Sequence, residues 1–186
     1  MGIPPRRSIG RSSGPRCVRE TWLSFWRPFR TSEKTRTSPV ESTFLGKLIC
    51  ERLLIDTNIL SELRKAHRCN PGVRDWFAQR SGDELWLSVL VVAELRRGAA
   101  LVRRRDPDSA ARLESWLIAV EASYADRILP VSLDVSHQLS LMWIPDPLPV
   151  IDALLAATAL THGLVLVTRN LADVESSGAS VLNPFI

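Results

Sequence analysis

Cysteine is scarce in this sequence, which has only Cys17, Cys50 and Cys69 among its 186 residues. The odd count, without a CxxC pair or metal-type spacing, supports neither a disulfide framework nor a zinc site. The longest apolar stretches, around residues 85–92 and 148–160, are too short or too interrupted to supply the about 20 residues that span a bilayer. No transmembrane helix is therefore predicted, and a reducing, cytoplasmic location is expected.

The motifs of several common enzyme classes are also missing. The chain contains no GxGxxG, P-loop or GxSxG motif, which argues against dinucleotide binding, P-loop nucleotide hydrolysis and serine-hydrolase chemistry. Its three histidines, His67, His137 and His162, lack the spacing of metal ligands and are expected to be surface or packing residues.

The charge of the chain is unevenly distributed. There are 24 Lys and Arg against 20 Asp and Glu, which gives a net charge of +4. Residues 1–49 hold 10 of the basic and 3 of the acidic residues, so residues 50–186 keep 14 basic and 17 acidic residues, a net charge of −3. The Arg-, Ser-, Thr- and Pro-rich segment 1–49 is predicted to be a disordered extension. Three interpretations of it stay open: a dispensable tail, a nucleic-acid-binding arm, or a targeting segment.

From residue 50 onward, short apolar runs alternate with helical patterns, which predicts a single α/β domain. Strands are predicted at residues 52–56, 85–88, 128–131, 164–167 and 180–182. Helices are predicted at or near residues 59–63, 71–77, 89–105, 109–120, 135–143 and 151–162, with a Pro-rich loop at 144–149. Strands of four or five residues separated by helices predict a mainly parallel central sheet covered on both faces, in three layers.

Single residues mark where several helices begin and end. Asn70 followed by Pro71 has the pattern of a cap and first helical residue. Ser88 and Asp108 are expected to cap the two helices that follow. Gly163 is expected to end the apolar helix 151–162.

Three aspartates are expected at strand ends or helix starts. Asp56 ends the first predicted strand, Asp152 lies in the first turn of an apolar helix, and Asp173 follows the fourth strand. Each has an ordinary explanation by itself: a helix cap or Asx turn for Asp56, a favourable helix-dipole interaction for Asp152, and a solvated loop for Asp173.

Glu94 is a fourth acid in an apolar setting. It lies in the predicted helix 89–105 and is expected to share a face with Leu90, Val91 and Leu101. A carboxylate buried among such neighbours without a partner is costly, although a solvated stripe of the helix remains an alternative.

The four acids are expected to lie close together, because a doubly wound sheet gathers strand ends and helix starts on one edge. Carboxylates that converge repel one another, and a hard divalent cation relieves that repulsion. Oxygen ligands favour Mg²⁺ or Mn²⁺ over zinc. Carboxylates that hold Mg²⁺ are typical of phosphodiester hydrolysis by an activated water molecule.

Four stretches that surround these acids resemble the PIN-domain nucleases, and most closely the VapC toxins of VapBC toxin-antitoxin pairs. They read LIDTNILSE at 54–62, LSVLVVAELRRG at 87–98, LPVIDALLAATA at 148–159 and LVTRNLAD at 166–173. Their order over about 130 residues makes the resemblance specific, although each stretch alone is weak. It implies a three-layer PIN-like fold with a short-stranded, mainly parallel sheet flanked by helices.

The resemblance also implies an activity, that of a type II toxin acting as a Mg²⁺-dependent endoribonuclease, with Mn²⁺ able to substitute. Asp56 and Asp152 would be the principal metal ligands. Glu94 and Asp173 would complete the acidic pocket directly or through water and help to position the attacking water. Weaker assignments are Thr57, Asn58 and Thr168, which would hydrogen-bond these carboxylates, and Arg169, which would meet the substrate phosphate or form a structural salt bridge.

Implied partners are an RNA substrate of unresolved class (tRNA, rRNA or mRNA), a cognate VapB-like antitoxin and a second copy of the chain, with no membrane. Two alternatives stay open: a non-catalytic RNA-binding or regulatory PIN-like domain, and a domain that acts mainly within an antitoxin-bound complex repressing its own promoter.

Arg96, Arg97 and the arginines at 103–105 would contact RNA or form a solvated helix end. Two departures from the family are the 49 residues before the first strand and Val174, where Phe is frequent.

Overall fold

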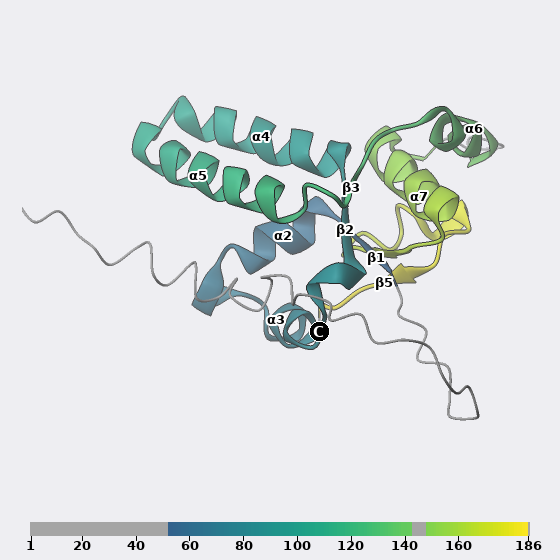
Figure 1. Ribbon diagram of the computed structural model, residues 1–186, viewed down its shortest axis with the longest axis horizontal. Helices are drawn as coiled ribbons and strands as arrows, with labels where there is room; N and C mark the ends of the chain where they lie inside the picture. Colours follow the sequence, from purple (N-terminus) through teal and green to yellow (C-terminus); the bar gives the residue numbers. More distant parts are fainter. Residues whose placement is uncertain (1–51, 143–147, 186) are drawn as a thin grey trace, which may run out of the picture. The chain divides into compact units, whose positions relative to one another are not determined.

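The computed structural model describes residues 52–142 and 148–185 (Figure 1). The predicted extension 1–49, Trp143 at the end of a predicted helix, and residues 144–147 of the predicted Pro-rich loop lie outside the described residues.

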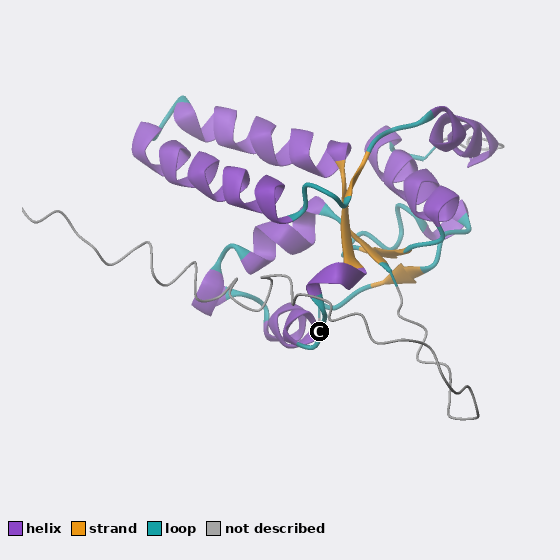
Figure 2. Cartoon of the chain, in the orientation of Figure 1, coloured by secondary structure: helices purple, strands orange, loops and turns teal. Residues whose placement is uncertain are grey.

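Short strands and longer helices alternate along the described chain (Figure 2). The strands are β1 (Leu53–Ile55), β2 (Leu85–Ser88), β3 (Ile128–Leu129), β4 (Val165–Val167) and β5 (Val181–Leu182). The α-helices are α2 (Thr57–Leu63), α3 (Pro71–Ala78), α4 (Val89–Arg103), α5 (Pro107–Ser123), α6 (Leu133–Met142) and α7 (Val150–His162). The short 3₁₀ turns η2 (Ala66–Arg68), η3 (Gly82–Glu84) and η4 (Glu175–Ser177) complete the assignment of the described residues.

The five described strands pair in parallel, in the order β3-β2-β1-β4-β5. The central strand β1 aligns Leu53 with both Leu85 of β2 and Val165 of β4. Because β1 is covered on both faces, its sequence is continuously apolar, and Leu53, Leu54 and Ile55 are completely buried. The predicted three-layer α/β fold is confirmed, with a sheet whose described strands are all parallel.

The strand order determines which helices cover each face. The chain moves outward from β1 through β2 to β3, and then crosses back beyond β1 to β4 and β5. Right-handed crossovers therefore place α2–α5 on one face and α6 and α7 on the other. Figure 1 shows the α4–α5 hairpin on one side of the strands and α6 and α7 on the other. The direction of winding reverses between β1 and β4, and this switch point is where open α/β sheets form ligand sites.

Most predicted helix ends are confirmed. The Asn70 side chain accepts a hydrogen bond from the Val73 amide, and the Ser88 side chain accepts one from the Leu90 amide. Gly163 ends α7 with a left-handed φ of 61°, a conformation that glycine adopts without steric cost.

The predicted cap of α5 is wrong. Asp106, not Asp108, precedes the helix, and its side chain accepts a hydrogen bond from the Ser109 amide. The reason is Pro107, which has no amide hydrogen and a fixed φ, and which therefore occupies the first helical position. Asp108 lies in the first turn instead.

The predicted face around Glu94 also needs correction. The buried residues of α4 are Val91, Leu95 and Ala99, whereas Leu101 is 49% exposed. Leu101 does follow Glu94 by two turns, but this row of residues lies one position away from the core-facing row. Glu94 is therefore only partly buried and stands at the border of the core.

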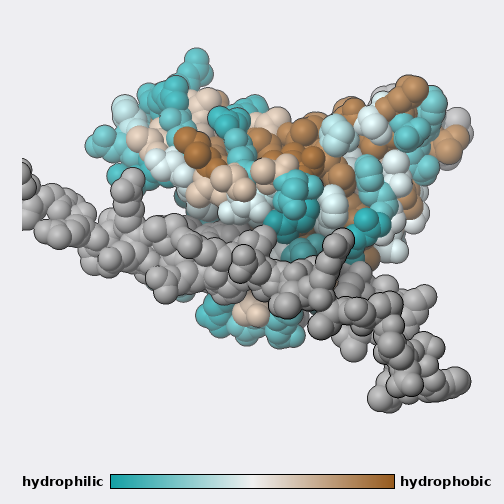
Figure 3. Space-filling model, viewed as in Figure 1, coloured by the Kyte–Doolittle hydropathy of each residue, from teal (hydrophilic) through white to brown (hydrophobic). Residues whose placement is uncertain are grey.

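The described surface combines polar residues with apolar side chains (Figure 3). Large exposed apolar residues on α6 and α7 include Leu133, Leu141 and Val150. None of the helices in residues 52–142 and 148–185 combines the length and apolar character needed to cross a membrane.

Candidate acidic site at the switch point of the sheet

Asp56 lies where β1 ends and α2 begins, at the switch point. Its side chain accepts a hydrogen bond from the Thr57 amide at 2.5 Å and so caps α2, as the simplest interpretation of this residue predicts. Its own amide donates to the Val167 carbonyl of β4 at 3.0 Å, which fixes the backbone to the neighbouring strand. Asp56 is only 6% exposed. Capping and a chemical role are therefore compatible for this residue.

Two further side chains hold the second oxygen of Asp56. Thr168 directly follows β4, and its hydroxyl donates to Asp56 Oδ2 at 2.6 Å. The Asn58 side-chain amide donates to the same oxygen at 2.5 Å and to the Thr168 hydroxyl at 3.0 Å. The carboxylate thus has three donors on about four lone-pair positions, and one position on Oδ1 remains available. The predicted carboxylate contacts of Asn58 and Thr168 are present.

Glu94 reaches the same edge from α4, the helix that follows β2. Its Oε2 accepts a hydrogen bond from the Thr57 hydroxyl at 2.5 Å. Thr57 therefore joins the start of α2 to Glu94, while its backbone amide holds Asp56. Glu94 is only partly buried on α4, and the hydrogen bond from Thr57 holds its side chain at this edge.

Asp152 and Asp173 belong to the other side of the switch point. Asp152 is half-buried in the first turn of α7, and Asp173 is exposed in the segment after β4. The Asn170 side chain hydrogen-bonds Asp152, and the Asn170 amide donates to the Thr168 hydroxyl at 3.0 Å. Asn170 was not predicted as a site residue, and its position within the LVTRNLAD stretch is the only sequence signal for it.

The acids influence one another electrostatically. Burial raises the pKa of Asp56 most, hydrogen bonds from Thr168 and Thr57 oppose that rise, and the charges of Asp152 and Glu94 add to it. Burial also raises the pKa of Asp152, with further increases from Asp173 and Glu94. The charges of Glu94 and Asp152 therefore act on Asp56, and Asp173 joins the group through its effect on Asp152.

The side chains as they stand do not form a closed metal cage. Among residues 52–142 and 148–185, no group of three or more His, Cys, Asp or Glu is arranged to hold a metal ion. Mg²⁺ nevertheless keeps several water ligands and is usually bound by one or two carboxylates. Asp56, which has a free lone-pair position, and Asp152 offer that kind of all-oxygen donor set. A cation there would also offset the repulsion that raises both pKa values.

Arg169 lies beside the acids without forming an ion pair within the described residues. Its amide donates to Asn58 Oδ1 at 3.3 Å, and its guanidinium carbon lies 5.4 Å from the centre of the Phe185 ring. This cation-π contact takes the place of the salt bridge considered from the sequence.

Two of the other arginines considered for RNA contact are bound to acids. Arg96 forms a bidentate pair with Glu121 at 2.7 and 2.6 Å, and Arg103 pairs with Glu114. Both pairs join α4 to α5 and so explain these two arginines structurally. Arg104 and Arg105 are exposed in the turn between the two helices.

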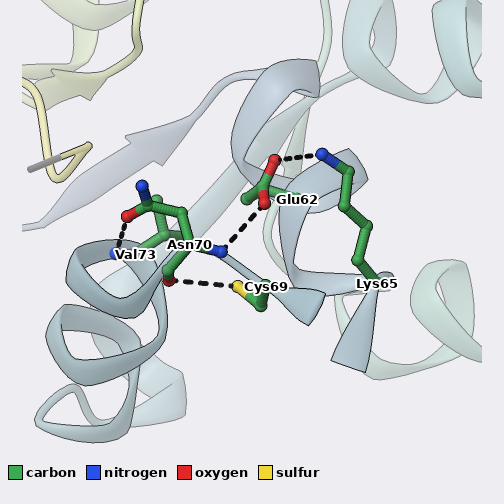
Figure 4. A network of polar contacts seen from close by, with 5 residues as sticks. All are labelled: Glu62, Lys65, Cys69, Asn70 and Val73. Atoms are coloured by element: carbon green, nitrogen blue, oxygen red, sulfur yellow. Dashed lines mark hydrogen bonds and ion pairs between the residues drawn. The ribbon is translucent and has the colours of Figure 1, made fainter. Parts of the chain in front are cut away.

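A second polar network, centred on Glu62, was not predicted from the sequence (Figure 4). Glu62 is 8% exposed; its Oε2 pairs with Lys65 Nζ at 2.6 Å, and its Oε1 accepts from the Asn70 amide at 2.9 Å. The hydrogen bond from Lys65 is the main cause that lowers the pKa of Glu62, and the charge of Arg169 contributes to the same effect. Glu62 thereby connects the end of α2 to the cap of α3.

The model of the PIN domain family matches residues 53–172, which include all the described strands except β5. The chain belongs to the PIN domain family. Val174, the departure from the family pattern, is 1% exposed and packs in the core next to the matched region.

Particular relatives include a protein named as a VapC ribonuclease. The chain is 31% identical over 140 residues to the VapC ribonuclease Y4jK of Sinorhizobium fredii, covering 72% of this chain and 97% of that protein. It is also 31% identical over 140 residues to the plasmid stability protein StbB of Pseudomonas syringae pv. tomato, covering 72% and 98%. The solved structure of FitAB bound to an IR36 DNA fragment matches with a TM-score of 0.66 and 26% identity, over 72% of this chain and 96% of that one.

Proposed function

We propose that this protein is the toxic component of a type II toxin-antitoxin system and acts as a Mg²⁺-dependent endoribonuclease in the cytoplasm. The observation that supports it most is the gathering of Asp56, Glu94, Asp152 and Asp173 at the switch point of a PIN domain. The similarity to a protein named VapC ribonuclease supports the same activity. Mn²⁺ is expected to replace Mg²⁺, because both prefer oxygen ligands.

Each acid has a distinct task in the proposed mechanism. Asp56 and Asp152 would hold the cation, which when bound supplies the positive charge that acidifies a water molecule and stabilises developing negative charge on the phosphate. Glu94, fixed by the Thr57 hydroxyl, and the exposed Asp173 would orient the attacking water. Thr168 and Asn58 keep Asp56 in one orientation. Arg169 would contact the substrate phosphate from the loop after β4.

Cleavage of RNA by the purified protein tests this proposal. We expect cleavage with Mg²⁺ or Mn²⁺, and a loss of cleavage in EDTA or after Asp56→Asn or Asp152→Asn, with the circular dichroism spectrum unchanged. Asp134→Asn is a matched control because Asp134 is also an acid in the first turn of a helix, α6, and is exposed. Undiminished cleavage in EDTA would exclude the metal mechanism, whereas binding without cleavage of any RNA would favour the non-catalytic alternative.

We also infer a cognate VapB-like antitoxin and self-association of the chain. The FitAB structure that this chain resembles is bound to an IR36 DNA fragment, which supports a complex that binds DNA. The exposed apolar residues on α6 and α7 give a surface suited to a second copy.

A neighbouring reading frame for a small DNA-binding protein would support the toxin-antitoxin pair. Sequencing the 5′ ends of RNA after induced expression would identify the RNA class and the cleavage site.

A further inference from the structure

A short basic segment follows α2, in a domain whose own net charge is negative. Residues 64–68, here called the basic turn, contain Arg64, Lys65, His67 and Arg68, and all four are exposed. The basic turn contains no acidic residue. Lys65 is paired with Glu62, but neither Arg64 nor Arg68 has an ion-pair partner among residues 52–142 and 148–185. Within the part of the chain that the structure describes, these two exposed arginines can therefore meet an anion.

The backbone of the basic turn is held in an unfavourable conformation. Ala66 has a φ of 52° and is the only non-glycine residue with positive φ in the described part of the chain. Such a conformation persists where the surrounding structure enforces it, and it occurs often at ligand-binding positions. Here the Glu62 carboxylate provides the constraint, because it binds Lys65 before Ala66 and the Asn70 amide after it (Figure 4).

The basic turn and the acidic site stand at the two ends of one short helix. Asp56 caps α2, and the basic turn begins one residue after Leu63, where α2 ends. A helix of seven residues is about 10 Å long, so one RNA strand can contact both ends. Glu62 also senses the charge of Arg169, whose amide is bound to Asn58 beside the acids.

We propose that Arg64 and Arg68 bind the RNA backbone a few nucleotides from the bond that is cut, and that Glu62 is the positioning residue of this contact. The ligand is the phosphodiester backbone, whose recognition by arginine is independent of sequence. This inference rests on the proposed ribonuclease function and extends it to how the substrate is held. It assigns the attraction for RNA to a defined position on an otherwise acidic domain.

Binding of a fluorescent single-stranded RNA of mixed sequence, measured by anisotropy over a series of KCl concentrations, tests the contact. The full chain carries Asp152→Asn throughout to prevent cleavage. We expect Arg64→Gln/Arg68→Gln to lower the affinity and to reduce the slope of log K against log[KCl] by about 1.4, since each phosphate contact on single strands contributes about 0.7. The control, Arg104→Gln/Arg105→Gln, removes the same charge from the turn between α4 and α5. The proposal treats that turn as a solvated helix end, so this variant should leave the slope unchanged.

Glu62→Gln separates positioning from simple charge. The substitution removes a negative charge, so it tightens RNA binding if Glu62 is only a counter-ion. We expect it to weaken binding instead, because a neutral amide at this position loses the ion pair with Lys65 that fixes the basic turn. Its melting temperature and circular dichroism spectrum establish that the chain is folded. Tighter binding by Glu62→Gln would overturn the positioning role.

Several results would overturn the contact itself. These are an unchanged salt slope in Arg64→Gln/Arg68→Gln, an equal fall in the Arg104→Gln/Arg105→Gln control, or no RNA binding by the parent chain. The assay does not require catalysis. If the chain without Asp152→Asn fails to cut RNA while the binding assay gives the expected slopes, the ribonuclease proposal is contradicted and the RNA contact stands. If that chain cuts RNA but the slope is unchanged in Arg64→Gln/Arg68→Gln, the RNA contact is contradicted and the ribonuclease proposal stands.

Discussion

At the scale of single residues, the aspartates that would bind the cation also lower the stability of the metal-free fold. Asp56 and Asp152 are carboxylates whose pKa values are raised by burial and by neighbouring acids. A raised pKa in the folded state means that the ionised form costs stability once the pH exceeds the value of the unfolded chain. The hydrogen bonds from Thr168 and Thr57 reduce this cost for Asp56 without removing it.

Asp152→Asn is therefore expected to stabilise the metal-free protein at neutral pH while it removes the response to Mg²⁺. The melting temperature should rise by about 1–3 °C, since charge effects at partly exposed groups are below about 1 kcal/mol. The gain should shrink as the pH falls through the raised pKa of Asp152 and vanish below the unfolded value. Thermal scans with and without Mg²⁺ measure both effects. A destabilised variant, or an equal gain from Asp134→Asn, would contradict the explanation.

At the scale of elements, the sequence predicts the order and type of nearly every described strand and helix, because apolar periodicity and capping residues are local signals. Asn70, Ser88 and Gly163 mark helix ends for reasons that their own chemistry supplies. Predictions that depend on several elements were less successful. The sequence predicts a shared face for Glu94 and Leu101, but that face depends on how α4 packs against its neighbours. It gives no sign of the contacts of Asn170 and Glu62, because they depend on where the loop after β4 meets α7 and where the end of α2 meets the start of α3.

The cap of α4 matters to the site because this helix carries Glu94. Ser88 is completely buried, and its hydroxyl accepts from the Leu90 amide at 3.2 Å. Ser88→Ala should lower the free energy of unfolding by about 1 kcal/mol, as is typical for loss of a serine cap. Ser115→Ala in α5 is the control, because its exposed hydroxyl donates to the Ala111 carbonyl inside a helix and should change stability little. Urea denaturation measures both variants, and equal effects would refute the capping explanation.

At the scale of the whole molecule, the net charge of +4 combines two segments of opposite sign, −3 in residues 50–186 and +7 in residues 1–49. We expect a chain starting at residue 50 to keep its cleavage rate at high salt and to lose rate only at low salt, where the ten basic residues attract RNA over distance. RNA cleavage at two salt concentrations, with circular dichroism as a folding control, distinguishes the outcomes. Equal losses at both salts would show that segment 1–49 is needed for more than long-range attraction.

The bond between Thr168 and Asp56 joins residues 112 positions apart, and this separation has a consequence for how the protein is made. During synthesis, a chain that has grown only through α7 already contains Asp56, Glu94 and Asp152, but it lacks β4, the direct neighbour of β1. Contacts between such distant residues form late, since the loop that connects them must close first. A growing chain of the proposed toxin therefore cannot complete its acidic site before β4 and Thr168 have been synthesised.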